Sequence, residues 1–294
     1  ACGWRIVFYI WGFLGLGWMV IWHFVAASTP NEHSWIKDDE RMYILENMKH
    51  ASAGAGSGLT GAGSDLDNDD GDLGDGKKRV AVPWRRMLTC PATWGLVVAH
   101  SSYNWHSYLL MTELPSYMKD VLDYDLAKAG ILAGLPFLCQ YICMLLIPHA
   151  ADWLIRSEHL QRVNVRRLMQ STGLLVAAFL LITTSYIEVK IAAMLLMFAS
   201  AGISGMCISG FQCGHIEICP DNAGYVMALT NTFATIPGIV APLITGVLLK
   251  SHGCHHFPDE GCKTGYREMF WISGGVMTLG TTIYCLTIRA HPLF

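Results

Sequence analysis

Charged side chains are scarce in this sequence of 294 residues, of which only 15% are Asp, Glu, Lys or Arg. Soluble domains carry about 25% charged residues, so this composition argues against a soluble protein. The formal net charge of −3 is small, and we expect no nucleic-acid partner. Hydrophobic residues make up 52% of the chain and gather in long runs. These runs indicate a multi-pass membrane protein that partners the lipid bilayer.

The sequence also lacks the signatures of common enzyme classes. It contains no nucleophile motif, no glycine-rich nucleotide fingerprint and no HExxH motif. An aspartate-rich stretch at residues 65–75 lacks the terminal Glu of a calcium loop. We therefore expect no enzymatic activity, no cofactor and no resident metal ion.

About seven apolar runs are long enough to cross a bilayer, which takes about 20 residues. They cover residues 6–25, 94–118, 126–150, 168–186, 191–213, 225–249 and 269–288. The polar part between the first two runs contains a segment at residues 51–76 that is rich in Gly, Ala, Ser and Asp, which predicts disorder. The sequence thus predicts a span at residues 1–25, a central loop at 26–90 and an all-α membrane domain at 91–294.

Basic residues predict the orientation of these spans. They concentrate at residues 77–86 and 156–167, which lie on the same side of the membrane if the spans alternate. Loops rich in Lys and Arg are retained in the cytosol, so these two loops and the C-terminus are predicted to be cytosolic. The loop with Cys254 and Cys262 then lies on the outer side. There a local disulfide, two free thiols and a zinc site are all conceivable, although zinc-finger spacing is absent.

The run at residues 94–118 carries uncharged polar residues at one helical face. They stand at i, i+3, i+4, i+7 and i+8, namely His100, Tyr103, Asn104, Ser107 and Tyr108. Unpaired polar groups are costly in hydrocarbon, so this face must look into protein or water. It is either a set of helix–helix hydrogen bonds or the wall of a solute pathway.

Two further constellations could carry chemistry. His215 and Glu217 follow the fifth span and form either a proton relay or gate, or an interfacial capping pair. In the sixth span, Asn231 precedes Pro237 and Gly238. Such a break is either a simple kink or the kind of broken helix that transporters use near their substrate.

Five stretches, taken together, resemble one membrane-protein family. They read PWRRMLTCPATWGLVVAH, NWHSYLLMTELPSYM, GILAGLPFLCQY, ADW followed by VRRLM, and ISGFQCGHIEICPDNAGYVMALTNTFATIPGIVAPLITG. They resemble the anion transporter family of sialin, the vesicular glutamate transporters and the sodium–phosphate cotransporter-like proteins, within the major facilitator superfamily. The resemblance implies that the chain is the sixth of twelve spans, the central loop and the C-terminal half. We therefore expect a fragment that partners a missing N-terminal half.

The resemblance also implies roles for individual residues. Substrate would contact residues of two spans, namely Tyr103, Asn104, Tyr108 and Asn231. Gating or proton relay would fall to Asp152, Arg156, His215 and Glu217. Tyr103 departs from the family, because the vesicular glutamate transporters have an arginine there that meets the substrate carboxylate. A phenol cannot supply that charge, which argues against glutamate.

The expected function is secondary active transport of a small organic or inorganic anion, coupled to H⁺ or Na⁺, by alternating access. The expected location is the lysosomal, vesicular or plasma membrane. Two alternatives remain open from the residues alone: a seven-helix receptor, and an inert or regulatory half-transporter.

Overall fold

The computed structural model describes residues 5–27, 29–33, 35–56, 82, 84–254, 260–289 and 293. Every regular element within these ranges is a helix, which confirms the predicted all-α class. Contacts divide the chain into two units, residues 1–77 and 78–294, and each is described by itself.

The first unit contains α1 (Arg5–Val25) and α2 (Asp38–Gly56). Helix α1 has 21 residues and a nearly uninterrupted apolar sequence, and it coincides with the first predicted span. Helix α2 begins with Asp38, Asp39 and Glu40, whose charges favour a helix N-terminus. It continues to Gly56, so residues 51–56 are helical where disorder was predicted. The alanines of this piece are strong helix formers and prolong α2. The rest of the predicted disordered segment, residues 57–76, lies outside the described residues.

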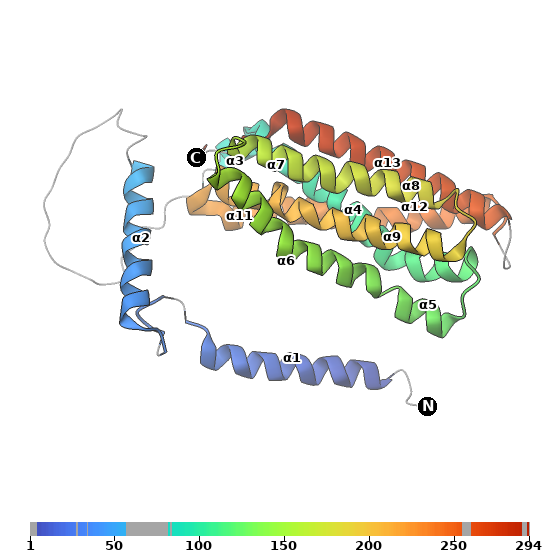
Figure 1. Cartoon of the computed structure of the whole chain (residues 1–294), viewed down its shortest axis with the longest axis horizontal. Helices are drawn as coiled ribbons and strands as arrows, with labels where there is room; N and C mark the ends of the chain where they lie inside the picture. The colour runs from blue at the N-terminus through green and yellow to red at the C-terminus, as the bar shows by residue number, and fades with distance from the viewer. Residues whose placement is uncertain are drawn as a thin grey trace, which may run out of the picture. The chain divides into compact units, whose positions relative to one another are not determined.

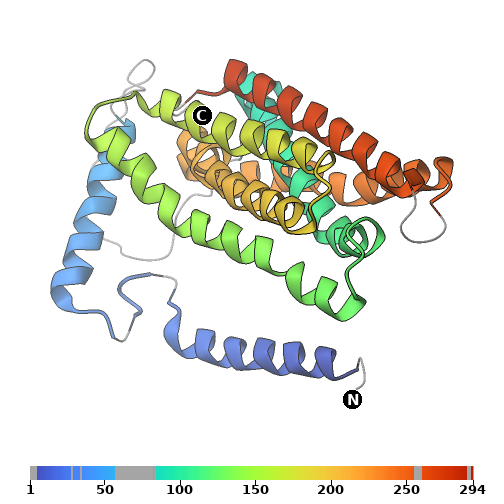
Figure 2. The same cartoon turned by 45° about the vertical axis from the view of Figure 1, so that its right-hand side comes forward.

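The second unit is a bundle of long helices that lie side by side (Figures 1 and 2). It opens with the short α3 (Trp84–Thr89) and the 30-residue α4 (Pro91–Asp120). The following segments are α5 (Leu126–Leu132) with α6 (Leu135–Arg156), and α7 (Arg162–Ser171), η1 (Thr172–Val176) and α8 (Ala177–Thr184). Then come α9 (Lys190–Ser204), η2 (Gly205–Ser209), α10 (Phe211–Ile218), η3 (Pro220–Asn222), α11 (Ala223–Ala234), α12 (Pro237–Ser251) and α13 (Glu260–Thr287). Helix α4 packs against α11, α12 and α13, so it lies inside the bundle.

Six of the segments in the described ranges are long and apolar enough to cross a membrane. They are α1, α5 with α6, α7 to α8, α9 to α10, α11 with α12, and α13. The remaining predicted span is α4, which is ~45 Å long at 1.5 Å per residue. The polar face of α4 lowers the hydropathy of this helix below that of the six other spans. Side chains of this face are buried or half-buried in the bundle.

The outer faces of α6 and α12 are apolar and exposed. Large side chains there are 53–68% exposed, namely Leu145, Leu146, Ile239, Leu243 and Val247. A water-soluble domain rarely exposes so large an apolar patch, whereas lipid covers it. These faces agree with the membrane location that the six spans indicate.

Proline follows two of the breaks in the spans. Pro136 stands in the first turn of α6, after the break at residues 133–134. Pro237 stands in the first turn of α12, after the break at residues 235–236. Proline has no backbone N–H, so the carbonyl that would pair with it loses its helical partner. The second break lies where the sequence predicted a kink or a broken helix, at Pro237 and Gly238. Pro148, by contrast, lies inside the continuous α6.

The fifth span is longer than predicted. Helix α10 runs through Ile218, so His215 and Glu217 are helical, although the sequence predicted a loop at residues 215–224. Helix α13 likewise begins nine residues before its predicted start at residue 269. In both places the helix includes polar residues beyond its apolar run. The drop in hydropathy along the sequence therefore did not coincide with the helix boundary.

The bundle has two ends. We call the end formed by residues 120–126, 185–190 and 251–254 the disulfide end, because Cys254 and Cys262 are joined there. The opposite end contains residues 157–161, 219–222 and 288–289. Leu293 donates its backbone N–H to the carbonyl of Ile218 at this opposite end, 2.9 Å away, which places the last described residue there.

Candidate functional site

The polar face of α4 points into the bundle. His100 is buried, while Tyr103, Asn104, Ser107 and Tyr108 are half-buried. Two neighbouring segments, α6 and α11, offer hydrogen-bond partners to this face, and α10 packs aromatic rings on it. The face therefore satisfies the requirement that its polar groups avoid lipid.

Asn104 binds the break between α11 and α12. Its side-chain Nδ2 donates to the carbonyl oxygen of Ala234, 2.9 Å away. In a continuous helix this carbonyl would pair with the N–H of Gly238, but that N–H binds Thr235 instead. The break thus frees one carbonyl, and Asn104 supplies its donor. An amide nitrogen has two hydrogens, so one N–H of Asn104 remains available.

Tyr103 lies against two other segments. Gln140 of α6 donates from Nε2 to the Tyr103 hydroxyl at 3.2 Å and to Ser204 Oγ at 3.0 Å. The Tyr103 ring packs on Phe211 of α10, with centroids 5.5 Å apart. Because the hydroxyl accepts from Gln140, its own proton remains available for donation. Sequence reasoning missed Gln140, although a lone amide in the apolar run at residues 126–150 was a signal for it.

Tyr108 packs on the start of α12. A Cβ on Gly238 would meet the Tyr108 ring at 3.1 Å, so the glycine lets the ring approach the helix. Ser107 Oγ is buried and has no hydrogen-bond partner in the described part of the chain. Asn231, by contrast, is exposed, so it does not join Tyr103 and Asn104 in this packing.

His215 takes part in a buried hydrogen-bonded chain with His100. Its Nε2 lies 2.8 Å from Thr230 Oγ1, and its Nδ1 lies 3.0 Å from the carbonyl oxygen of Gln212. His100 Nδ1 lies 3.1 Å from the same Thr230 oxygen. A carbonyl only accepts, so in the neutral ring His215 Nδ1 has the proton and Nε2 is an acceptor for the Thr230 hydroxyl. That hydroxyl has a single proton, for which the carbonyl oxygen of Met227 at 3.1 Å competes. The threonine oxygen then accepts from His100 Nδ1–H. These hydrogen bonds join α4, α10 and α11.

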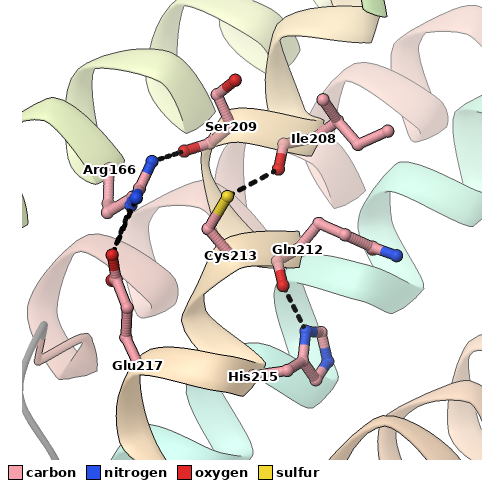
Figure 3. Close-up of polar contacts among 7 residues, drawn as sticks. All are labelled: Arg166, Ile208, Ser209, Gln212, Cys213, His215 and Glu217. Atoms are coloured by element: carbon pink, nitrogen blue, oxygen red, sulfur yellow. Dashed lines mark hydrogen bonds and ion pairs between the residues drawn. The ribbon is translucent and has the colours of Figure 1, made fainter. Parts of the chain in front are cut away.

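Glu217 points away from His215, toward the other side of α10 (Figure 3). Its Oε1 accepts from Arg166 Nη2 at 2.7 Å and from Nε at 3.0 Å. Arg166 Nη1 also donates to the carbonyl of Ser209 at 2.8 Å. The side chains of this ion pair are 9% and 10% exposed, so it is a buried contact between α7 and α10. His215 and Glu217 therefore contact different neighbours in this conformation, and Arg166 is a partner that sequence reasoning missed.

Asp152 and Arg156 lie at the opposite end of α6, and both are exposed. The ion pairs formed among the described residues include neither of them. In this conformation they are therefore not engaged with each other.

Metal ligands are not gathered anywhere in the described ranges, where no three His, Cys, Asp or Glu side chains lie together. Cys254 and Cys262 are joined as a disulfide rather than held apart. Two histidines between these cysteines, His255 and His256, lie outside the described residues.

The sequence is similar to a known protein family and to several named proteins. A family model described as Major Facilitator Superfamily matches residues 1–242. Human sialin is 31% identical over 289 residues, which is 98% of this chain and 52% of that protein. Sheep sialin is 34% identical over the same shares. Human vesicular glutamate transporter 2 is 30% identical over 249 residues, or 85% of this chain and 40% of that protein.

One solved structure is similar in fold. It is a bacterial homolog to the human lysosomal transporter Spinster, in an inward-facing and unoccupied conformation. The alignment has a TM-score of 0.54 at 11% identity, and it covers 95% of this chain and 63% of that one. This likeness shows the fold alone. The chain spans about half the length of the sialins that it matches.

Proposed function

Because the chain belongs to the Major Facilitator Superfamily, we propose that it forms the pathway wall of a secondary active transporter for a small organic or inorganic anion. Sialin and the vesicular glutamate transporters are its relatives over most of its length. These relatives are transporters and not enzymes, and the family match sets the seven-helix receptor aside.

The observation on which the proposal rests is the bond between Asn104 and the Ala234 carbonyl. It joins the polar face of a central helix to a broken span. Transporters place substrate sites at such breaks, where the backbone has unpaired polar groups. A movement of α12 about residues 235–236 therefore acts on Asn104 directly, which fits a site that opens to alternate sides.

The side chains near this break suit an anion because they offer donors. Asn104 retains one N–H, Tyr103 retains its O–H, and the buried Ser107 hydroxyl has no partner in the described chain. Asn104 and Tyr103 contact the solute, and Tyr108 closes the site on the α12 side. These groups supply no positive charge to pair with a second carboxylate, which argues against glutamate as the solute.

Coupling to an ion gradient rests on the chain of His100, Thr230 and His215. Two imidazoles bridged by one hydroxyl can pass a proton between α4 and α10. We assign H⁺ as the coupling ion on this ground, with Na⁺ as the alternative.

Gating rests on charges at the opposite end. Asp152 and Arg156 are exposed in this conformation, so both are available for a contact that forms when the pathway closes. Asn231 is exposed as well and meets the solute only after such a rearrangement.

The disulfide supports one orientation of the bundle. Disulfides persist in oxidising compartments, so the end with Cys254 and Cys262 faces the lumen or the exterior. The opposite end and the C-terminus then face the cytosol, as the basic loops predict. The membrane is lysosomal, vesicular or plasma.

Uptake into proteoliposomes tests the proposal. The longest product of the gene is reconstituted beside this 294-residue chain, and a panel of sialic acid, glutamate, urate and phosphate is offered under an imposed pH or Na⁺ gradient. Gradient-driven uptake of one anion supports the proposal. Uptake by the longer product alone identifies this chain as a part of the transporter. If neither folded protein transports any anion, the inert or regulatory reading is favoured.

A further inference from the structure

A cavity lies at the disulfide end, away from the polar face of α4. It has a volume of about 520 Å³ and is enclosed by the end of α4, the turn between α8 and α9, and the start of α13. Small-molecule sites fall in the range of about 300–1,000 Å³, so the cavity is large enough for a small organic solute.

The cations that line this cavity differ in their partners. Lys190 pairs with Asp123 at 3.2 Å, and Lys263 pairs with Glu260 at 2.7 Å. Arg267 lines the same cavity and forms neither a hydrogen bond nor an ion pair with any described residue. Among the described residues, its guanidinium is thus the lining cation whose charge no ion pair offsets.

Arg267 is held in place by an aromatic ring and not by an acid. The guanidinium carbon lies 5.0 Å from the centroid of the Tyr186 ring. Trp271 fixes that ring, because its Nε1 donates to the Tyr186 hydroxyl at 2.9 Å. The Nε atom of Arg267 is buried without a hydrogen-bond partner. The guanidinium is planar, and its N–H groups can meet a carboxylate with two parallel bonds.

We propose that this cavity binds a small organic carboxylate, with Arg267 as the bidentate donor and Tyr186 as the platform that orients it. Two of the three acids that line the cavity, Asp123 and Glu260, are paired with lysines, which offsets their charge. Glu188 has no hydrogen bond or ion pair in the described chain, and it accepts from a hydroxyl or ammonium group on the same solute. The site is independent of the anion site proposed at α4.

Binding of dansylglycine, a fluorescent carboxylate, tests this site on the purified 294-residue chain in detergent. Dansylamide, which lacks the carboxylate, controls for partition into the micelle. We expect saturable binding of dansylglycine only, and a loss of affinity of about tenfold or more in Arg267→Gln, since hydrogen bonds to charged groups are strong. Arg267→Lys should restore part of the affinity. Arg162→Gln, at an exposed arginine of the opposite end, should leave it unchanged. Equal binding of both probes, or unchanged affinity in Arg267→Gln, overturns the proposal.

A second measurement on the unaltered chain covers the case in which Arg267→Gln does not fold. Phenylglyoxal modifies accessible arginines, and mass spectrometry reports the adduct at Arg267. Dansylglycine should slow this modification, while dansylamide should not. Equal modification of Arg267 with and without dansylglycine contradicts a carboxylate at this residue.

Discussion

Asn104 of α4 donates its side-chain amide to the backbone carbonyl of Ala234, 130 positions further along the chain and 2.9 Å away. The bond is possible because the break at residues 235–236 directs the N–H of Gly238 to Thr235 and leaves the Ala234 carbonyl without a helical partner. A single side chain therefore links the polar face of α4 to the break between α11 and α12.

Asn104→Ala should reduce anion uptake by at least about tenfold, because it removes both the bond to Ala234 and the remaining donor to the solute, each worth about 1–3 kcal/mol. Initial rates of uptake into proteoliposomes, normalised to the amount of folded protein, measure this. Asn164→Ala is the matched control, since Asn164 is exposed on α7. Normal uptake in the Asn104 variant would remove this residue from the site.

Tyr103→Phe should raise the KM for the anion by roughly tenfold with little change in the amount of folded protein. The ring and its packing on Phe211 remain, while the hydroxyl that donates to the solute is lost. Concentration dependence of uptake gives the KM. Tyr141→Phe is the control, because Tyr141 is 57% exposed on the outer face of α6. Equal KM values in the two variants would mean that the Tyr103 hydroxyl does not contact the solute.

Thr230→Val should uncouple transport from the pH gradient. It keeps the shape of the side chain and removes the oxygen that lies between His100 and His215. We expect loss of gradient-driven uptake, while exchange of labelled for unlabelled anion at equal pH persists. Thr232→Val is the control, because Thr232 is exposed and bonds only to its own helix. A variant that still concentrates the anion under a pH gradient would show that this hydroxyl does not relay the proton.

Glu217→Gln should destabilise the bundle by about 3–5 kcal/mol, because it leaves the buried Arg166 charge without its partner. The double variant Arg166→Met with Glu217→Met should recover most of this loss, since apolar side chains of similar volume tolerate burial. Thermal unfolding in detergent measures both. The matched control is Asp123→Asn, which removes an exposed ion pair worth about 1 kcal/mol or less. Similar melting temperatures for Glu217→Gln and Asp123→Asn would contradict a structural role for the buried pair.

Local patterns in the sequence predicted most of the elements of the bundle. Length and hydropathy located the spans, and Pro237 predicted the break before α12. The spacing of polar residues predicted which face of α4 turns inward. Each of these properties depends on residues that are neighbours in the chain. The predicted end of α10 and the predicted start of α13 were wrong, because a helix can extend into polar sequence once packing holds it.

The partners of the polar residues could not be predicted in the same way. Arg166 and Glu217 lie 51 positions apart, and Arg166 belongs to a basic loop that served only as an orientation signal. His215 and Glu217 stand two positions apart, which places them on different sides of a helix and gives them different partners. Spacing assigns a residue to a face, but which neighbour meets that face depends on how distant segments pack.

The central claim is tested most directly by driving uptake of the panel anions with one imposed gradient at a time. Proteoliposomes of the longest gene product are loaded at equal pH and Na⁺, and then diluted to create either a pH or a Na⁺ gradient. We predict accumulation of at least one anion above its external concentration under the pH gradient, abolished by a protonophore and by Asn104→Ala. Accumulation that is absent under both gradients, in protein shown to be folded and inserted, would contradict secondary active transport by this chain.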